Sequence, residues 1–260
     1  MAIVTGATSL IGLGHAVARV LAEQGATVVV HDVVAPDESV AALTSAGLKA
    51  VSFVSDLATQ EGMADLVAFA AERFGRVDIL VNNAGIGHLC GPLVDFSAED
   101  WDAMFAINVR ACFFGVKYAA RQMAVQPVLG ETWGRGRIVN VASQAAKSGF
   151  ALHGAYTATK HAVLGLTRAA AVELAPEGIT VNAVCPNHMG TALGSRLNRM
   201  MAEQKGMTLE AYIEGMVSRI PLGRLGRPGD SAGVCGFLCS AAAAYVTGEA
   251  WNVSGGEEYH

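Results

Sequence analysis

The alternation of short apolar runs with longer amphipathic stretches is the feature that most constrains how this chain can fold. The short runs are rich in Val and Ile and do not alternate with polar residues, as expected for strands buried on both faces. Repetition of strand and helix in this way predicts a doubly wound sheet with helices on both sides. The expected strands are Ala2–Val4, Thr27–His31, Ala50–Val54, Ile79–Val81, Arg137–Val141, Thr180–Val184 and Ala250–Val253.

Helical patterns occupy most of the chain between these runs. A chain of 260 residues is long enough for one large α/β domain and short for two. Hydrophobic residues make up 52% and charged residues 16%, which suits a buried sheet and argues against disorder. The expected helices are Ile11–Gln24, Glu38–Ala46, Gly62–Phe74, Glu99–Met123, Ala155–Ala175 and Gly229–Ser240.

Composition and charge argue against several classes of protein. The formal net charge is -5 and the sequence has no basic patch, so we expect no binding to nucleic acid. No apolar run is long and uninterrupted enough for a transmembrane helix, and the N-terminus has no secretion signal. The cysteines are odd in number and follow no framework or zinc spacing. We expect a cytoplasmic protein with reduced thiols, no metal site and no membrane contact.

The segment 187–227 interrupts the regular alternation after the sixth expected strand. It is rich in Met, Gly and Arg and has a helical pattern of its own. Ligands of open α/β sheets bind beyond the carboxyl ends of the strands, so a mobile insertion there is a candidate substrate lid. A surface excursion without a role is the alternative.

A glycine-containing turn follows the first expected strand. Gly6 permits a tight turn, and Gly12 permits close packing of the next helix against the sheet. The helix N-terminus then offers unpaired N–H groups and the positive end of its dipole to a pyrophosphate. The predicted contacts of this turn with a dinucleotide come from Gly6, Ser9, Leu10, Ile11 and Gly12.

Asp32 follows the second expected strand and indicates which dinucleotide binds. A carboxylate at this strand end accepts hydrogen bonds from the adenosine ribose hydroxyls and repels a 2′-phosphate. No Lys or Arg stands at Ser9, His31 or Val33 to neutralise that phosphate, and we expect His31 to be neutral near pH 7. The sequence therefore favours NAD over NADP as the cofactor, the alternative being a solvated loop Asp.

The next two strands end in residues that suit the same cofactor. Asp56 and Leu57 follow the third strand, where an adenine ring would lie. Asn83, Ala84 and Gly85 follow the fourth, where the small residues leave room for the cofactor and the Asn can brace neighbouring strand ends. These five residues are predicted cofactor contacts.

Tyr156 and Lys160 carry the chemistry that we expect of the chain. They are separated by four residues at the start of an apolar helix and so share one face of it. The pKa of a free tyrosine is about 10, and a nearby ammonium group stabilises the phenolate and lowers that value. We expect Tyr156 to act as general acid for reduction and general base for oxidation, with Lys160 also holding the nicotinamide ribose.

Ser143 and Asn108 complete the predicted catalytic group. Ser143 follows the fifth expected strand, where its hydroxyl can orient the substrate oxygen opposite Tyr156. Asn108 lies inside an apolar helical run, and a buried Asn needs a hydrogen-bond partner. It could hold a water that relays protons to Lys160, or it could be a core Asn that kinks the helix.

Together these residues resemble the pattern of the classical short-chain dehydrogenase/reductase family over nearly the whole chain. The motifs occur in family order, from the Thr5–Gly6 turn to Pro186 and Thr191. The resemblance implies a single Rossmann-type domain over 1–260 with a seven-stranded parallel sheet. It also implies the tetrad Asn108, Ser143, Tyr156 and Lys160, nicotinamide contacts near Pro186, Met189 and Thr191, and a homotetramer built on the apolar helices Glu99–Met123 and Ala155–Ala175.

Three positions depart from the family pattern. Leu10 stands where a second glycine is usual, and the spacing of Gly12 and Gly14 does not replace that glycine. Asn187 stands where a glycine usually follows the proline, and its side chain could reach the substrate. The chain also begins almost on its first strand, so we expect that strand to be short.

The sequence therefore favours an NAD-dependent dehydrogenase that acts on a secondary alcohol or ketone. Polar residues near the site lean toward a polyol, sugar or similar hydroxylated small molecule. The residues expected at the substrate are Ser143, Ala145, His153, Tyr156 and Asn187, with Gln144 and His188 placed similarly. The alternatives are a 3-oxoacyl thioester reductase, against which Asp32 argues, and a nicotinamide-sensing or scaffold protein, against which the intact Ser143, Tyr156 and Lys160 argue.

Overall fold

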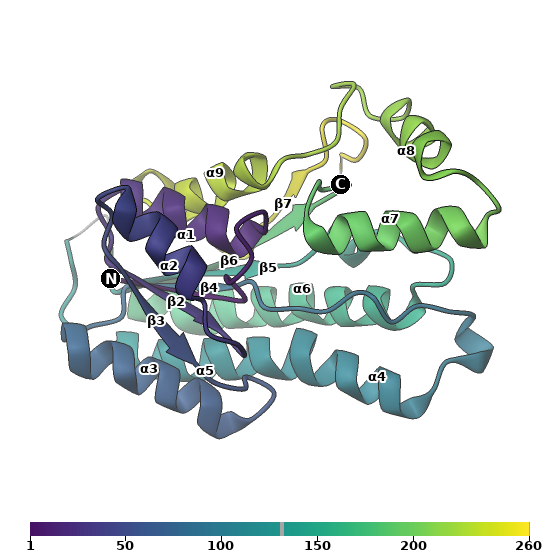
Figure 1. Ribbon diagram of the computed structural model, residues 1–260. Helices are drawn as coiled ribbons and strands as arrows, with labels where there is room; N and C mark the ends of the chain where they lie inside the picture. Colours follow the sequence, from purple (N-terminus) through teal and green to yellow (C-terminus); the bar gives the residue numbers. More distant parts are fainter. Residues whose placement is uncertain (131–132, 260) are drawn as a thin grey trace.

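A seven-stranded parallel sheet forms the centre of the molecule (Figure 1). The computed structural model describes residues 1–130 and 133–259. The strand order is β3-β2-β1-β4-β5-β6-β7, and each pair of neighbouring strands is parallel. The strands are β1 (Ala2–Thr5), β2 (Val28–Asp32), β3 (Ala50–Val54), β4 (Ile79–Asn82), β5 (Gly136–Val141), β6 (Ile179–Pro186) and β7 (Ala250–Val253).

The doubly wound sheet and its strands are therefore confirmed, with ends that differ by no more than two residues from those expected. β1 is short, with 4 residues. The chain winds outward from β1 toward β3 and then returns to β4 on the other side of β1. This reversal is the topological switch point at which open α/β sheets bind their ligands.

Helices cover both faces of the sheet. Figure 1 shows α1, α2 and α9 on one face and α3, α4, α5 and α6 on the other. The helices are α1 (Leu13–Glu23), α2 (Asp37–Ser45), α3 (Gln60–Phe74), α4 (Ala98–Phe105), α5 (Ala111–Ala124), α6 (Gly154–Leu174), α7 (Ala192–Gln204), α8 (Leu209–Val217) and α9 (Pro228–Leu238).

Three apolar clusters hold these layers together in the described residues, and the two larger ones lie on opposite faces of the sheet. On the first face, Val17 and Leu21 of α1 and Leu238 of α9 pack against the strands. On the second, Leu66 of α3 and Met123 of α5 do the same. Side chains on both faces of the five inner strands are mostly buried, so these strands read as nearly continuous apolar runs, which is why the pattern was visible in the sequence.

The expected helices are observed with ends shifted by up to two residues, and two differences bear on the site. The helix expected over Glu99–Met123 is interrupted by a π-helical turn, Ala106–Arg110, between α4 and α5. Asn108 lies in this turn, as the alternative interpretation of a distorted helix anticipated. The first helix begins at Leu13 and not at Ile11, with Gly12 as its N-cap.

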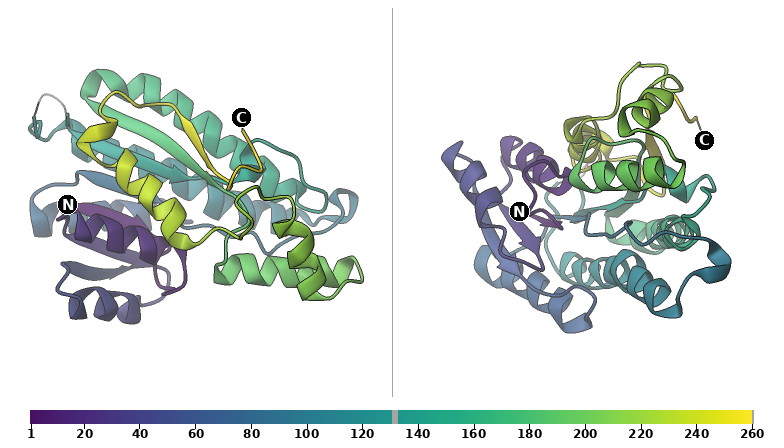
Figure 2. Two further views of the ribbon diagram at one scale, coloured as in Figure 1. Left: turned by 90° about the horizontal axis from the view of Figure 1, so that it is seen from above. Right: turned by 45° about the vertical axis from the view of Figure 1, so that its right-hand side comes forward.

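The segment 187–227 forms α7 and α8, which project beyond the carboxyl edge of the sheet (Figure 2). The two ends of the segment are joined at its base: Gly190 N donates to Gly226 O at 2.9 Å, and Met189 and Gly226 form a parallel bridge. Within residues 1–130 and 133–259, no helix combines the length and apolar character needed to cross a bilayer. No cluster of metal-ligating side chains occurs in that same part of the chain.

Candidate active site

A cleft with a volume of about 720 Å³ runs along the carboxyl edge of the sheet, between the strand ends and the 187–227 segment. Its size is that of a site for a small molecule or cofactor. Most of the residues predicted from the sequence line it. They are Gly6, Ser9, Gly12, Asp32, Asp56, Leu57, Asn83, Ala84, Gly85, Ser143, Ala145, His153, Tyr156, Lys160, Pro186, Asn187, Met189 and Thr191.

Leu10 and Ile11 do not line the cleft with the other predicted residues. Their side chains are 48% and 63% exposed and lie in a turn before α1. The expected cofactor contacts from these two residues are therefore not supported by their placement. The reason is that the turn is longer than the sequence interpretation assumed, so that Leu10 and Ile11 loop outward.

The close packing of the first helix against the turn, expected of Gly12, is made by Gly14 in this structure. A Cβ added at Gly14 would lie 2.6 Å from Asn83 Nδ2 and 2.8 Å from Ala7 Cα, and it would also collide with the Gly6 carbonyl oxygen. Only glycine permits this approach of α1 to the first turn. The long spacing between Gly6 and Gly12 is accommodated by the exposed turn that holds Leu10 and Ile11.

The N-terminus of α1 opens into the cleft and fits an anionic group. Gly12, Leu13 and Gly14 line the cleft, and the N-cap Gly12 provides no side-chain hydrogen bond to the first turn. The first turn also holds no acidic residue. Free N–H groups and the positive end of the helix dipole are therefore available to a pyrophosphate, as a dinucleotide requires.

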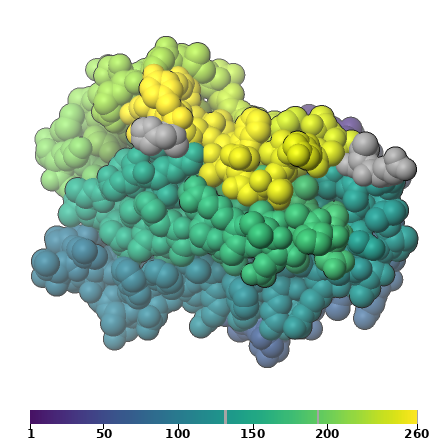
Figure 3. All heavy atoms as spheres, turned by 180° about the vertical axis from the view of Figure 1, so that it is seen from behind, coloured from purple at the N-terminus to yellow at the C-terminus, as the bar shows by residue number. Residues whose placement is uncertain are grey.

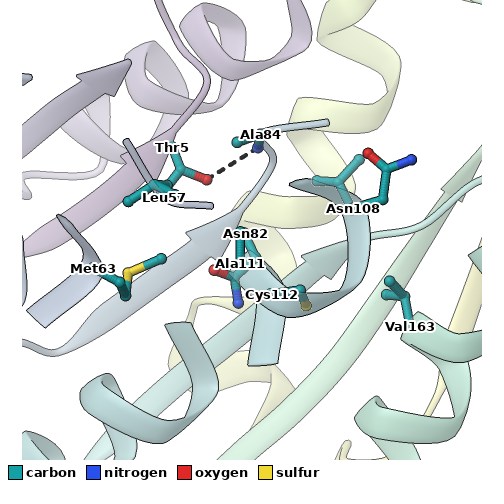
Figure 4. Close-up of a pocket in the computed structure, with 10 residues that line it drawn as sticks. Thr5, Leu57, Met63, Asn82, Ala84, Asn108, Ala111, Cys112 and Val163 are labelled. Atoms are coloured by element: carbon teal, nitrogen blue, oxygen red, sulfur yellow. Dashed lines mark hydrogen bonds between the residues drawn. The ribbon is translucent and has the colours of Figure 1, made fainter. Parts of the chain in front are cut away.

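The braced ends of β1 and β4 form the floor beneath this turn. Asn83 Nδ2 donates to the carbonyl oxygens of Thr5 and Gly6, each at 2.8 Å. Thr5 Oγ1 accepts hydrogen bonds from the backbone N–H groups of Asn83 and Ala84 at 3.0 Å, the second of which is drawn in Figure 4. Figure 4 also shows Asn82 and Asn108 beside a water-sized cavity of about 10 Å³ under the cleft. The expected bracing of strand ends by Asn side chains is present.

Asp32 defines the electrostatics at the other end of the cleft. Its Oδ2 accepts from Thr8 N at 3.1 Å and its Oδ1 from Val33 N at 2.8 Å, so the backbone fixes the carboxylate. The neighbouring His31 is buried, and this burial lowers its pKa, with a hydrogen bond to Ser55 and the charge of Asp32 acting in the opposite direction. His31 is therefore neutral near pH 7 and adds no positive charge that could attract a 2′-phosphate.

Tyr156 and Lys160 lie one helical turn apart on α6 and both face the cleft. Lys160 Nζ lies 5.6 Å from the centre of the Tyr156 ring, and it donates to Val141 O at 2.9 Å. This bond anchors a buried ammonium to the end of β5, and an ammonium has two further N–H donors. Ser143 comes two residues after Val141 and also lines the cleft, and its Oγ accepts a hydrogen bond from Ala145 N at 3.2 Å.

Asn108 lies just beneath the cleft, and its side chain bridges two elements. Its Oδ1 accepts from Ile86 N at 2.8 Å, and its Nδ2 donates to Ile86 O at 2.8 Å and to Thr159 Oγ1 at 3.1 Å. Both amide donors are therefore used by the protein. Asn108 therefore joins the loop after β4 to the helix that carries Tyr156. A water could still be bound by the second lone pair of Asn108 Oδ1 and by the main chain of the π-helical turn.

The far end of the cleft comes from the 187–227 segment, and most of these residues were not identified from the sequence. Aliphatic, Met and Tyr side chains form an apolar wall, with a few polar groups near its rim. The segment also contributes His188, which the sequence placed near the substrate, and the following lining residues that it did not: Ala192, Gly194, Leu197, Asn198, Met201, Lys205, Tyr212, Met216 and Arg219. The abundance of Met in this segment was the one signal available in the sequence, since Met suits adaptable binding surfaces.

The fold and the cleft define a class, that of the Rossmann-type oxidoreductases that use a nicotinamide cofactor. Comparison with known proteins specifies the family: the chain belongs to the classical short-chain dehydrogenases/reductases. The family model that matches, described as enoyl-(acyl carrier protein) reductase, covers residues 6–258.

Similar proteins act on different substrates. The chain is 41% identical, over 98% of its length and 96% of the relative, to a protein named as a ketoacyl reductase of a monensin polyketide synthase in Streptomyces virginiae. It is 36% identical to the L-2,3-butanediol dehydrogenase of Corynebacterium glutamicum, covering 100% of this chain and 99% of the relative. It resembles an NAD+-bound xylitol dehydrogenase with a TM-score of 0.88 at 31% identity, covering 98% and 97% of the two chains. Other similar structures contain NADP.

These findings confirm the family, the Rossmann fold and the coarse activity, oxidoreduction between a secondary alcohol and a ketone. They do not distinguish NAD from NADP, because similar structures carry either cofactor.

Proposed function

We propose that the protein is an NAD-dependent dehydrogenase for a secondary alcohol of a polyol, sugar or similar small hydroxylated molecule. The observation that carries the proposal is the arrangement of the cleft. The Tyr156–Lys160 pair and Ser143 line its middle, and a backbone-held Asp32 lines one end. In this arrangement a bound nicotinamide supplies or accepts the hydride.

The side chains of this chain handle the proton. Tyr156 donates it to the substrate oxygen in reduction and accepts it in oxidation. The Lys160 ammonium stabilises the phenolate form and donates to the ribose of the cofactor, while the Ser143 hydroxyl holds the substrate oxygen in line. Asn108 supports a water next to Lys160 through which the proton reaches solvent.

The distribution of charge supports NAD over NADP. Among the residues that line the cleft in the described structure, the cationic side chains are Lys160, Lys205 and Arg219. None of these three residues is close in sequence to Asp32, whose carboxylate a 2′-phosphate would meet. Bringing two anions together in a partly enclosed cleft is unfavourable, so NADP binding is disfavoured.

The 187–227 segment is proposed as the substrate lid, within a single domain that spans 1–260. It contributes the far wall of the cleft, and its apolar lining can exclude water when substrate is bound. His153 Nδ1 donates to Ala151 O at 3.1 Å, which leaves Nε2 as an acceptor for a substrate hydroxyl. Ala145 leaves room beside Ser143.

A ketoacyl reductase is the second candidate function. The similarity of 41% identity to a protein of that name favours it. Such enzymes usually use NADPH, and the negative charge of Asp32 disfavours that cofactor. A nicotinamide-sensing or scaffold protein is the non-enzymatic alternative.

We also propose that the protein is a cytoplasmic homotetramer with a small-molecule substrate. Two apolar side chains that are exposed in the single chain, Phe113 on α5 and Val172 on α6, support contacts between copies of these helices. Sedimentation velocity measures the assembly directly, and a monomer at micromolar concentration contradicts this part of the proposal.

The test of the function is a dehydrogenase screen over polyols, sugars and hydroxy acids, with NAD and NADP in parallel and a 3-oxoacyl thioester as the competing substrate. We expect turnover of a hydroxylated substrate with NAD and at least about tenfold lower kcat/KM with NADP. Higher kcat/KM with NADP and the thioester would establish the second candidate. Cofactor binding without turnover of any substrate would favour the sensing protein.

A further inference from the structure

The carboxylate of Glu257 lies where the C-terminal tail meets the lid. Its side chain is only 13% exposed. Oε2 accepts hydrogen bonds from Asn187 Nδ2 at 2.9 Å and lies 3.1 Å from His188 Nε2, while Oε1 accepts from Arg219 Nε at 3.1 Å. One carboxylate therefore joins the first residues of the lid to the end of α8, over separations of 70 and 38 residues in sequence.

The backbone of the tail follows the same path. Asn187 N donates to Val253 O and Leu222 N donates to Gly255 O, both at 3.1 Å. A Cβ at Gly255 would lie 2.7 Å from Ile220 Cγ2, which shows how closely the tail packs on the lid. Figure 3 shows the yellow C-terminal chain against the green lid helices. The tail is thus a second support of the lid, in addition to the joined ends at its base.

The three partners of Glu257 all line the cleft. Asn187, His188 and Arg219 belong to its lining, whereas Glu257 does not. His188 also has a left-handed backbone with φ of 42°, which is uncommon for a residue other than glycine and has to be held by surrounding contacts. Glu257 is placed to supply such a contact while remaining outside the lining itself.

The donors around Glu257 make this arrangement specific for a carboxylate. Burial lowers the pKa of His188, opposed by the charge of Glu257, so the imidazole is neutral near pH 7. If Nε2 carries the proton, it donates to Glu257, as do Asn187 Nδ2 and Arg219 Nε. A glutamine side chain has only one oxygen, so it cannot accept hydrogen bonds both from Asn187 and His188 and from Arg219.

We propose that Glu257 is a positioning residue for the substrate end of the active site. By binding Asn187, His188 and Arg219 at once, it fixes the polar rim of the lid over the substrate and leaves the cofactor end unaffected. Its kinetic consequences rest on the function proposed above, whereas its effect on the lid does not.

The kinetic test compares Glu257→Gln with Glu258→Gln, a change of the same kind at the next residue, whose side chain makes none of these three bonds. We expect Glu257→Gln to raise KM for the alcohol about tenfold. The Kd of NAD, measured by fluorescence titration, should stay within about twofold, and Glu258→Gln should leave both unchanged. A double-mutant cycle with Asn187→Ala should be non-additive, because the two changes remove the same bond.

The test of the lid itself is limited trypsin digestion without substrate. Lys205 is an exposed cleavage site at the end of α7, between the two lid helices. Glu257→Gln should speed cleavage within the lid about tenfold at an unchanged thermal midpoint, because the change loosens one local contact. Glu258→Gln should cleave as the parent does.

The outcomes separate the two proposals. Faster lid cleavage together with no turnover of any alcohol by the parent protein would overturn the proposed function and keep the positioning role. Unchanged cleavage and KM in Glu257→Gln would overturn the positioning role. A fall in thermal midpoint with equal losses for NAD and alcohol would also overturn it, since Glu257 would then be a residue of general stability.

Discussion

The two ends of the cleft are built in different ways. The end proposed for the cofactor consists of backbone groups and glycines at the ends of β1, β2 and β4, braced by short side chains such as Thr5 and Asn83. The end proposed for the substrate consists of side chains from the proposed lid, held by a carboxylate from the tail. A backbone-built end suits one constant ligand, whereas a side-chain-built end can vary between relatives. This difference agrees with the range of activities named among similar proteins.

The middle of the cleft, which both ends share, should show the largest effect. Tyr156→Phe removes the proton donor and keeps the ring, so we expect kcat to fall by about 10³-fold with little change in the Kd of NAD. Stopped-flow turnover and fluorescence titration measure the two quantities. Tyr245→Phe, at a fully exposed tyrosine outside the cleft lining, serves as the matched control and should change kcat by less than about threefold. Comparable activity of Tyr156→Phe and the parent would mean that another group moves the proton.

Glycine substitutions should give the next largest effect and should distinguish the two ends of the cleft. Gly14→Ala places a methyl group against Asn83 and the first turn, so we expect at least about tenfold weaker NAD binding and a loss of about 1–3 kcal/mol in the free energy of unfolding. Gly215 of α8 has open space around its Cα, and Gly215→Ala should be neutral or slightly stabilising. Urea unfolding and NAD titration of both variants check this. Equal effects would remove the distinction between a backbone-built and a side-chain-built end.

Lowering the pH should destabilise the proposed substrate end of the cleft through protonation of His188. Because burial places its folded pKa below the ordinary value of 6.5, the open lid binds the proton more tightly than the closed one. The contribution of His188 to lid stability is therefore complete above pH 6.5 and is lost as pH falls below that value. The charges facing the ring are Glu257 and Glu258, which oppose the shift, and Arg219, which adds to it.

Hydrogen exchange of the lid at pH 5.5 and 7.5, corrected for intrinsic rates, measures this effect. His188→Asn keeps a residue that tolerates the left-handed backbone and removes the titration, so it should abolish the difference between the two pH values. A difference that persists in this variant would assign the pH dependence to another group.

The smallest effect is expected at Leu10. Its exposed side chain lies outside the cleft, so Leu10→Ala should change the Kd of NAD by less than about twofold and stability by less than about 0.5 kcal/mol. A marked loss of NAD affinity would return Leu10 to the cofactor contacts that the sequence predicted.

Comparison of these regions also shows how far the sequence could be interpreted. Apolar runs such as the one within Thr27–His31 and the four-residue spacing of Tyr156 and Lys160 are local patterns, and they predicted the strands and the shared face of α6. The position of Leu10 was misjudged because a residue count cannot show which residues of a longer turn loop outward. The Gly14 contact depends on Gly6, Ala7 and Asn83 meeting in space.

The sequence by itself determined the alternation of strands and helices, the order of the strand-end residues and the pairing of Tyr156 with Lys160. The strands were predicted from continuous apolar runs and the shared face of Tyr156 and Lys160 from the helical period of 3.6 residues, and both patterns act over a few positions. Only the tertiary structure decided that the amide of Asn108 forms hydrogen bonds with Ile86 and Thr159, and that Glu257 binds Asn187 and Arg219. Contacts between distant residues have no period along the chain and exist only once the sheet has brought the segments together.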